Sequence, residues 1–152
     1  METLKYVIDI AAPAEKVWIT MLEKETYEQW SASAWPGSRY EGRWALGEQL
    51  KFIGTDGAGT LAEITEFKPN VKVLARHIGL LGPNGKVDKT SDAAKSWIGT
   101  LEGYEFQETN GKTKLTVTIE TNPEWREMFD NDWPRALEDL KKLAEEQYAT
   151  AH

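Results

Sequence analysis

The chain has no cysteine among its 152 residues. Disulfides, thiolate metal ligands and a thiol nucleophile are therefore excluded. It has only two histidines, His77 and the terminal His152, whereas a zinc site needs about three or four His, Cys or carboxylate ligands. No glycine-rich phosphate loop precedes a helix pattern, and no serine triad is recognisable. We therefore expect neither a metal nor a cofactor.

Positive charge and long apolar runs are also scarce. Lys and Arg number 18 against 25 Asp and Glu, which gives a net charge of -7. This balance lacks the electrostatic footprint of nucleic-acid binding. Charged residues, Gly or Pro interrupt every apolar run, so we expect no membrane span. The first residues, METLKYVIDI, have a strand pattern and not that of a signal peptide. Together with the lack of cysteine, this favours a cytoplasmic protein.

Tryptophan is unusually abundant, with seven residues spread along the chain. One interpretation is a large core, which a chain of 152 residues can build as one domain over residues 1–152. The other is that several indoles line a cavity, because indole offers rigid apolar area with one polar group.

The C-terminal stretch from Asn122 to Tyr148 shows the strongest periodicity. Its apolar residues recur at i, i+3, i+4 and i+7, which predicts a long helix with one buried stripe. Pro134 lacks an amide hydrogen and should kink this helix or divide it near Asp132. The stripe comprises Trp125, Met128, Phe129, Trp133, Ala136, Leu137, Leu140, Leu143 and Ala144. Such a stripe needs a broad apolar partner, and upstream strands are the only candidate.

The upstream chain predicts one strand, two short helices and six further strands. The first strand is Thr3–Ile10, and the helices begin at Pro13 and Lys24. Because strands and helices are segregated, we expect an α+β fold. Its curved antiparallel sheet of six to seven strands would grip the long C-terminal helix. Residues 79–95 form the one long irregular stretch, which we expect at the rim of a site. The six later strands are 39–45, 48–53, 59–67, 71–78, 97–107 and 112–121.

Five short segments carry a family resemblance: PAEKVW (13–18), GTLAEITEFKPN (59–70), AKSW (94–97), EGYEF (102–106) and WPRALEDLKKLAE (133–145). In this order the chain resembles the START-like (SRPBCC) superfamily, which has the helix-grip fold. It looks most like the branch named after the heat-shock-protein ATPase activator. The resemblance implies a deep, largely apolar pocket between sheet and helix. Members of the superfamily include lipid and hormone carriers, aromatic-polyketide cyclases and chaperone-binding domains.

The Asn110-Gly111 turn sets the register of the last two strands, because a two-residue hairpin turn allows one pairing. Leu115, Val117 and Ile119 must face the core, so their predicted partners Glu102 and Tyr104 also point inward. An inward carboxylate costs several kcal/mol unless it is paired or protonated. Glu102 can therefore pair with a structural cation, lie at a wet pocket mouth, or serve a ligand.

Seven residues form the candidate ligand-binding site. His77 should share the concave face with Glu102 and Tyr104, although Tyr104 and His77 can also be ordinary core residues with satisfied hydrogen bonds. Partial desolvation should raise the pKa of Glu102. The candidate residues are Trp44, His77, Trp97, Glu102, Tyr104, Phe129 and Trp133.

Three functions remain open at this stage. The first is a binding domain for a small apolar, aromatic or lipid-like ligand. The second is an enzyme in the same pocket, with Glu102 or His77 as general acid or base and Tyr104 orienting the substrate. The third, which only the resemblance implies, is a regulatory module with a chaperone partner. The sequence indicates no oligomeric state.

Overall fold

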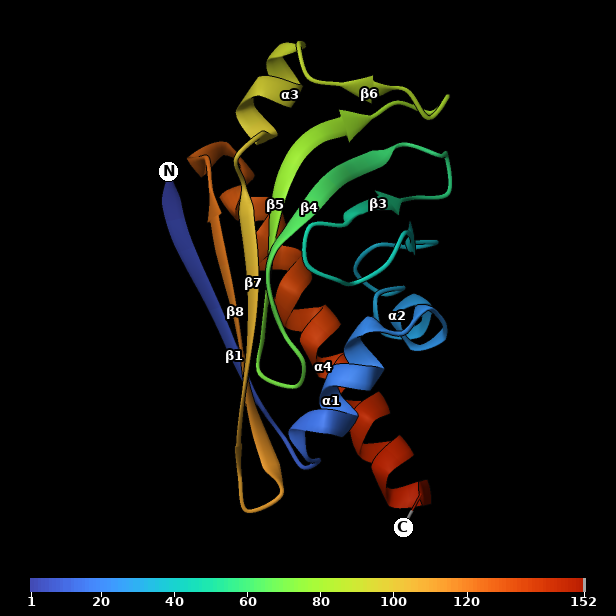
Figure 1. Cartoon of the computed structure of the whole chain (residues 1–152), viewed down its shortest axis with the longest axis vertical. Helices are drawn as coiled ribbons and strands as arrows, with labels where there is room; N and C mark the ends of the chain where they lie inside the picture. The colour runs from blue at the N-terminus through green and yellow to red at the C-terminus, as the bar shows by residue number, and fades with distance from the viewer. Residues whose placement is uncertain (152) are drawn as a thin grey trace.

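A curved antiparallel sheet lies against one long helix in the computed structural model, which describes residues 1–151 and only the backbone of residue 151 (Figure 1). The path of the sheet is β1-β8-β7-β5-β4-β3-β2, with β6 paired to β5 beside it. The strands are β1 Glu2–Ile10, β2 Arg39–Glu41, β3 Gln49–Ile53, β4 Gly59–Lys68, β5 Lys72–Leu81, β6 Val87–Asp88, β7 Leu101–Thr109 and β8 Lys112–Thr121. The α+β helix-grip prediction is confirmed.

The sheet has eight strands where six to seven were expected. The additional strand is β6, which lies within the stretch predicted to be irregular. It pairs through Val87 and Asp88 with the end of β5. Two residues are too few to show an alternating pattern, so the sequence carried no signal for this strand.

Helix α4, Arg126–Ala151, crosses the concave face of the sheet, and a 3₁₀ turn η1, Pro123–Trp125, precedes it (Figure 1). It continues through Pro134 without interruption, so the predicted division is wrong. Proline removes one intrahelical hydrogen bond, and the buried side chains of Trp133 and Leu137 hold the helix on either side. The other helices are α1 Ala14–Leu22, α2 Lys24–Trp30 and α3 Asp92–Trp97. None of the helices in residues 1–151 is long and apolar enough to cross a membrane.

The core lies between α4 and the sheet. Leu137 and Leu140 are only 3% and 0% exposed, as the predicted stripe requires, whereas Met128, which the prediction also included, is 37% exposed. The two leucines belong to the same buried cluster as Leu115, Val117 and Ile119 of β8. This shared cluster explains why the helix stays on the sheet despite its polar outer face.

Two register shifts bend the sheet between β4 and β5. At the first, Ala62 pairs with His77 and Leu61 pairs with Gly79, so Ile78 has no partner. An extra residue of this kind bends a strand and reverses the alternation of its side chains. His77 and Leu80 therefore both face the interior, whereas Ile78 packs into a separate small cluster.

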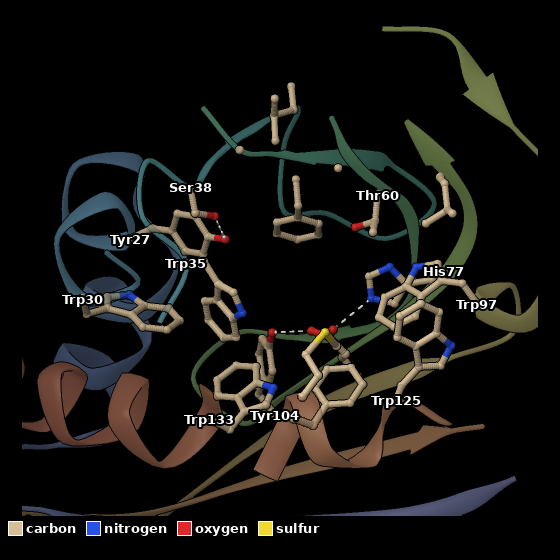
Figure 2. A pocket seen from close by; sticks show the side chains of 18 residues that line it. Tyr27, Trp30, Trp35, Ser38, Thr60, His77, Trp97, Tyr104, Trp125 and Trp133 are labelled. Carbon is tan, nitrogen blue, oxygen red and sulfur yellow. Dashed lines mark hydrogen bonds and ion pairs between the residues drawn. The ribbon is translucent and has the colours of Figure 1, made fainter. Parts of the chain in front are cut away.

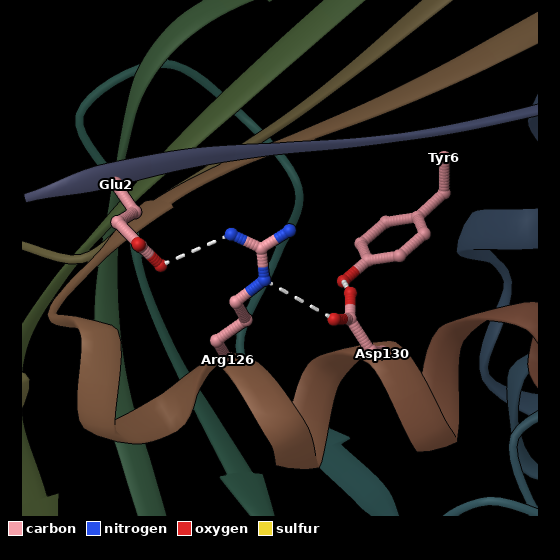
Figure 3. Close-up of polar contacts among 4 residues, drawn as sticks. All are labelled: Glu2, Tyr6, Arg126 and Asp130. Atoms are coloured by element: carbon pink, nitrogen blue, oxygen red, sulfur yellow. Dashed lines mark hydrogen bonds and ion pairs between the residues drawn. The ribbon is translucent and has the colours of Figure 1, made fainter.

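A polar cluster joins the first turns of α4 to the edge strand β1 (Figure 3). The Tyr6 hydroxyl donates to Asp130 Oδ1 at 2.6 Å. Arg126 Nε lies 3.4 Å from Asp130 Oδ2, and its Nη1 lies 3.5 Å from Glu2 Oε2. Burial and then the bond to Asp130 raise the pKa of Tyr6. The cluster ties the first turns of α4 to β1.

Candidate functional site

The β7–β8 hairpin places two polar side chains on the concave face. Glu102 pairs with Ile119 and Tyr104 pairs with Val117, which is the predicted register. Asn110 and Gly111 have φ values of 53° and 77°, as the two-residue turn requires. The sequence therefore located both side chains correctly through one turn.

A cavity of about 300 Å³ lies between the sheet, α4, α2 and the end of α3 (Figure 2). Its wall is mostly aromatic and aliphatic. It is lined by Tyr27, Trp30, Trp35, Ser38, Phe52, Ile53, Gly54, Gly59, Thr60, His77, Leu80, Trp97, Glu102, Tyr104, Trp125, Met128, Phe129 and Trp133. This volume is at the lower end of the range that ligand pockets occupy.

Six of the seven candidate residues line this cavity, and Trp44 is the exception. Strand β2 ends at Glu41, so Trp44 lies in the connection to β3 and not on a strand as expected. Its ring packs 5.9 Å from Phe52 and 6.4 Å from Tyr104, measured between centroids. Trp44 therefore lies behind two cavity residues.

Glu102, His77 and Tyr104 form one hydrogen-bonded group (Figure 2). Glu102 Oε1 lies 3.0 Å from His77 Nε2, and Glu102 Oε2 accepts from the Tyr104 hydroxyl at 3.0 Å. Because an ionised carboxylate can only accept, the proton of this first bond is on Nε2. The Glu102 side chain is 14% exposed and that of His77 is 3% exposed. Each carboxylate oxygen thus has a donor in a nearly dry environment.

The charge state of Glu102 differs from the expected one. Burial acts to raise its pKa, but the opposing positive charge of His77 and the hydrogen bonds from His77 and Tyr104 lower it below the ordinary value. The predicted rise is therefore wrong, because the positive charge of His77 and the two hydrogen-bond donors together outweigh desolvation. Burial and then the negative charge of Glu102 raise the pKa of Tyr104 well above its ordinary value. The group accordingly consists of a carboxylate and a neutral phenol.

His77 is held in place by its backbone and by an indole. Its amide donates to the Thr100 carbonyl at 2.8 Å, and its carbonyl accepts from the Gly99 amide at 2.9 Å. The imidazole lies 4.7 Å from the Trp97 ring. Its Nδ1 is buried and has no partner among the described residues. Among the described residues, the imidazole therefore makes one polar contact, which is the one with Glu102.

The side of the cavity that α2 and the chain after it build was not predicted from the sequence. Tyr27 and Trp30 lie one turn apart in α2, but nothing in this spacing distinguishes a cavity from a core. The Tyr27 hydroxyl lies 2.9 Å from Ser38 Oγ, which makes a second, smaller polar spot. Trp35 and Trp125 were also missed. Five of the seven tryptophans line the cavity, so their abundance was the available signal.

These features define a class of protein: an α+β helix-grip domain of the START-like (SRPBCC) superfamily with an internal cavity beneath its long helix. The family model described as Activator of Hsp90 ATPase homolog 1-like protein matches residues 11–145. The chain therefore belongs to this family. No curated protein matches it.

Solved structures share the fold at low sequence identity. The Aha1 dimer from Colwellia psychrerythraea has a TM-score of 0.72 at 20% identity, over 95% of this chain and 97% of that one. Protein MLL2253 from Mesorhizobium loti has a TM-score of 0.75 at 17% identity, over 95% and 98% of the two chains. DynU16, from the dynemicin biosynthetic locus, has a TM-score of 0.71 at 16% identity, over 95% of this chain and 48% of that chain. At these identities the likeness concerns the fold alone.

Proposed function

We propose that the chain binds a small, mainly apolar ligand in the cavity beneath α4, and that the Glu102 group orients the ligand's polar end. The observation that carries this proposal is an ionised carboxylate in the wall of an aromatic cavity of about 300 Å³. Burying such a charge costs several kcal/mol. A buried carboxylate with a cavity beside it is more typical of a binding site than of a packed core.

The geometry around Glu102 supports the role of a fixed anchor. His77 and Tyr104 each engage one carboxylate oxygen at 3.0 Å, and each oxygen has lone pairs to spare. The Tyr104 hydroxyl donates to Glu102, so its own lone pairs are free to accept. A ligand with a hydrogen-bond donor at one end would find two acceptors already in place.

An enzyme in this pocket has less support. A general acid that works near neutral pH needs a carboxyl whose pKa is raised, and the pKa of Glu102 is lowered. An ionised carboxylate of lowered pKa is also a weak base. The other candidate, His77, has its Nε2 bonded to Glu102 and its Nδ1 buried, so neither ring nitrogen is open to a substrate. The hydrogen-bonded group is thus better suited to recognition than to proton transfer.

The test compares ligand affinity in matched variants. A panel of small aromatic and lipid-like compounds is screened by thermal shift, and the hits are titrated by tryptophan fluorescence, for which five cavity indoles act as reporters. Glu102→Gln and Tyr104→Phe should each weaken binding by about 1–3 kcal/mol. Glu105→Gln serves as the control, because Glu105 is an exposed residue of the same strand.

Two outcomes would refute the proposal. The first is hits whose affinity is the same in the wild type and both cavity variants, since the ligands would then bind elsewhere. The second is a panel without hits, combined with the capture of a chaperone by the purified chain. That result would favour the chaperone-regulating role that the family description suggests.

A further inference from the structure

We propose that the ligand's polar end is positively charged, and that the cavity recognises a small organic ammonium ion. This inference rests on the proposed function and specifies its ligand class. It combines two features of the cavity wall, which are its charged groups and its aromatic composition.

The first feature is the set of charged groups. Of the 18 residues that line the cavity, none is Lys, Arg or Asp, and Glu102 is the one acidic residue. The one basic side chain in the wall is His77, whose Nε2 lies 3.0 Å from Glu102 Oε1. A neutral His77 leaves the wall with one negative charge and a protonated His77 leaves it with none, so the wall never carries surplus positive charge. A cationic ligand can therefore pair with Glu102, whereas an anionic ligand finds no surplus cation in the wall.

The second feature is the aromatic lining. Nine of the 18 lining residues are Trp, Tyr or Phe. Trp30 Nε1 donates to the Met21 carbonyl and Trp35 Nε1 donates to Asp132 Oδ2. The Nε1 atoms of Trp97, Trp125 and Trp133 are closed to solvent. All five cavity tryptophans thus keep their N–H group away from the space, which leaves ring carbons toward the ligand.

This orientation selects the sign of the ligand's charge. Anions bind where N–H and O–H donors converge, and here the indole donors are turned away. The faces of Trp, Tyr and Phe carry negative electrostatic potential and attract an ammonium group within about 6 Å. A carboxylate in a wall with nine aromatic side chains therefore favours a cation over an anion, by charge pairing and by cation–π contact with each ring face that is open to the cavity. An apolar or aromatic body on the cation would occupy the remaining wall.

The experiment uses two probes of nearly the same shape, phenyltrimethylammonium and tert-butylbenzene, which differ in one nitrogen and its charge. Binding to the full chain is followed by tryptophan fluorescence at physiological salt, with benzoate as an anionic comparison. The cation should bind the wild type about tenfold or more tightly than tert-butylbenzene. Glu102→Gln should remove most of this preference with little change for tert-butylbenzene. The exposed Glu105→Gln should keep the preference, which controls for the net charge of -7.

Each other outcome overturns the inference in an identifiable way. If tert-butylbenzene binds as tightly as the cation, or benzoate binds best, the cavity binds ligands but does not select ammonium ions. If the preference for the cation is equal in Glu102→Gln and the wild type, the cation is held by the general surface charge. If none of the three probes binds, and the wider apolar panel also fails, the proposed function falls together with this inference. The comparison of the three probes on the wild-type chain tests the inference even if Glu102→Gln does not fold.

Discussion

At the residue scale, Glu102 depends on His77 and Tyr104 for its charge, because these two side chains supply the hydrogen bonds that water would otherwise give. Both bonds measure 3.0 Å and engage different carboxylate oxygens. Loss of one donor leaves a nearly buried carboxylate oxygen without a hydrogen bond, and this destabilises the folded state most when the group is charged. Substitutions in this group should therefore be read as changes to a unit and not as independent effects.

The lowered pKa of Glu102 predicts how stability depends on pH. In the unfolded chain the pKa of a glutamate is about 4.3, and in the folded chain this carboxyl holds its charge to lower pH. The stabilisation is present above the unfolded value and is lost as the pH falls through the folded value. Between about pH 5 and pH 3, the free energy of unfolding of Glu102→Gln should therefore fall less than that of the wild type.

Urea unfolding at a series of pH values measures this difference. Glu105→Gln makes the same chemical change on the exposed face of β7 and should follow the wild-type curve. Parallel declines for the wild type and Glu102→Gln would show that Glu102 is not preferentially ionised in the folded state.

At the scale of elements, α4 is held by its buried stripe and not by its sequence propensity. Leu137 is 3% exposed and lies in the cluster that the strands complete. Leu137→Ala should lower the free energy of unfolding by about 2–5 kcal/mol, because it removes buried methyl groups and leaves a void. Glu138→Ala, at the next and exposed position, should change it by no more than about 0.5 kcal/mol.

Denaturant unfolding monitored by circular dichroism measures both variants. An effect of Leu137→Ala as small as that of Glu138→Ala would mean that the helix does not depend on the sheet for its place.

The elements that the sequence predicted correctly are those whose local signals agree with their packing. The Asn110-Gly111 turn determined the register of β7 and β8, and from it the inward direction of Glu102 and Tyr104. The stripe of α4 was equally legible, because a helix of this length repeats its pattern several times. Both predictions rest on local sequence patterns, which can be recognised without information about tertiary contacts.

Other features depend on contacts between distant segments, and local patterns could not report them. The unpaired Ile78 changes which residues of β5 face inward after His77, and only the pairing with β4 creates that shift. The alternation of residues up to Trp44 predicted a strand over residues 39–45, but that strand ends at Glu41. The pKa of Glu102 depends on His77, which is 25 residues away in the chain. Tyr27 reaches the cavity only because α2 packs against α4.

At the scale of the whole molecule, α4 has two parts with different supports. Its first turns cover the cavity through Met128, Phe129 and Trp133, and the bond from Tyr6 to Asp130 ties them to the edge strand β1 (Figure 3). Its later turns bury Leu140 and Ala144 completely in the core. The part over the cavity has open space beneath it, so local opening should begin there.

Native-state hydrogen exchange of Tyr6→Phe tests this division. The substitution removes the hydroxyl that donates to Asp130 at 2.6 Å and leaves the ring. The bond is partly exposed, so its loss should speed exchange of the amides in residues 126–133 by about two- to fivefold. Amides in residues 137–148 should keep their wild-type rates where they exchange through local openings that leave the bond to Asp130 intact. Val7→Thr, a control at the neighbouring exposed position of β1, should change neither set. Equal acceleration along the whole helix would show that α4 opens as one piece, and that its contact with β1 does not control access to the cavity.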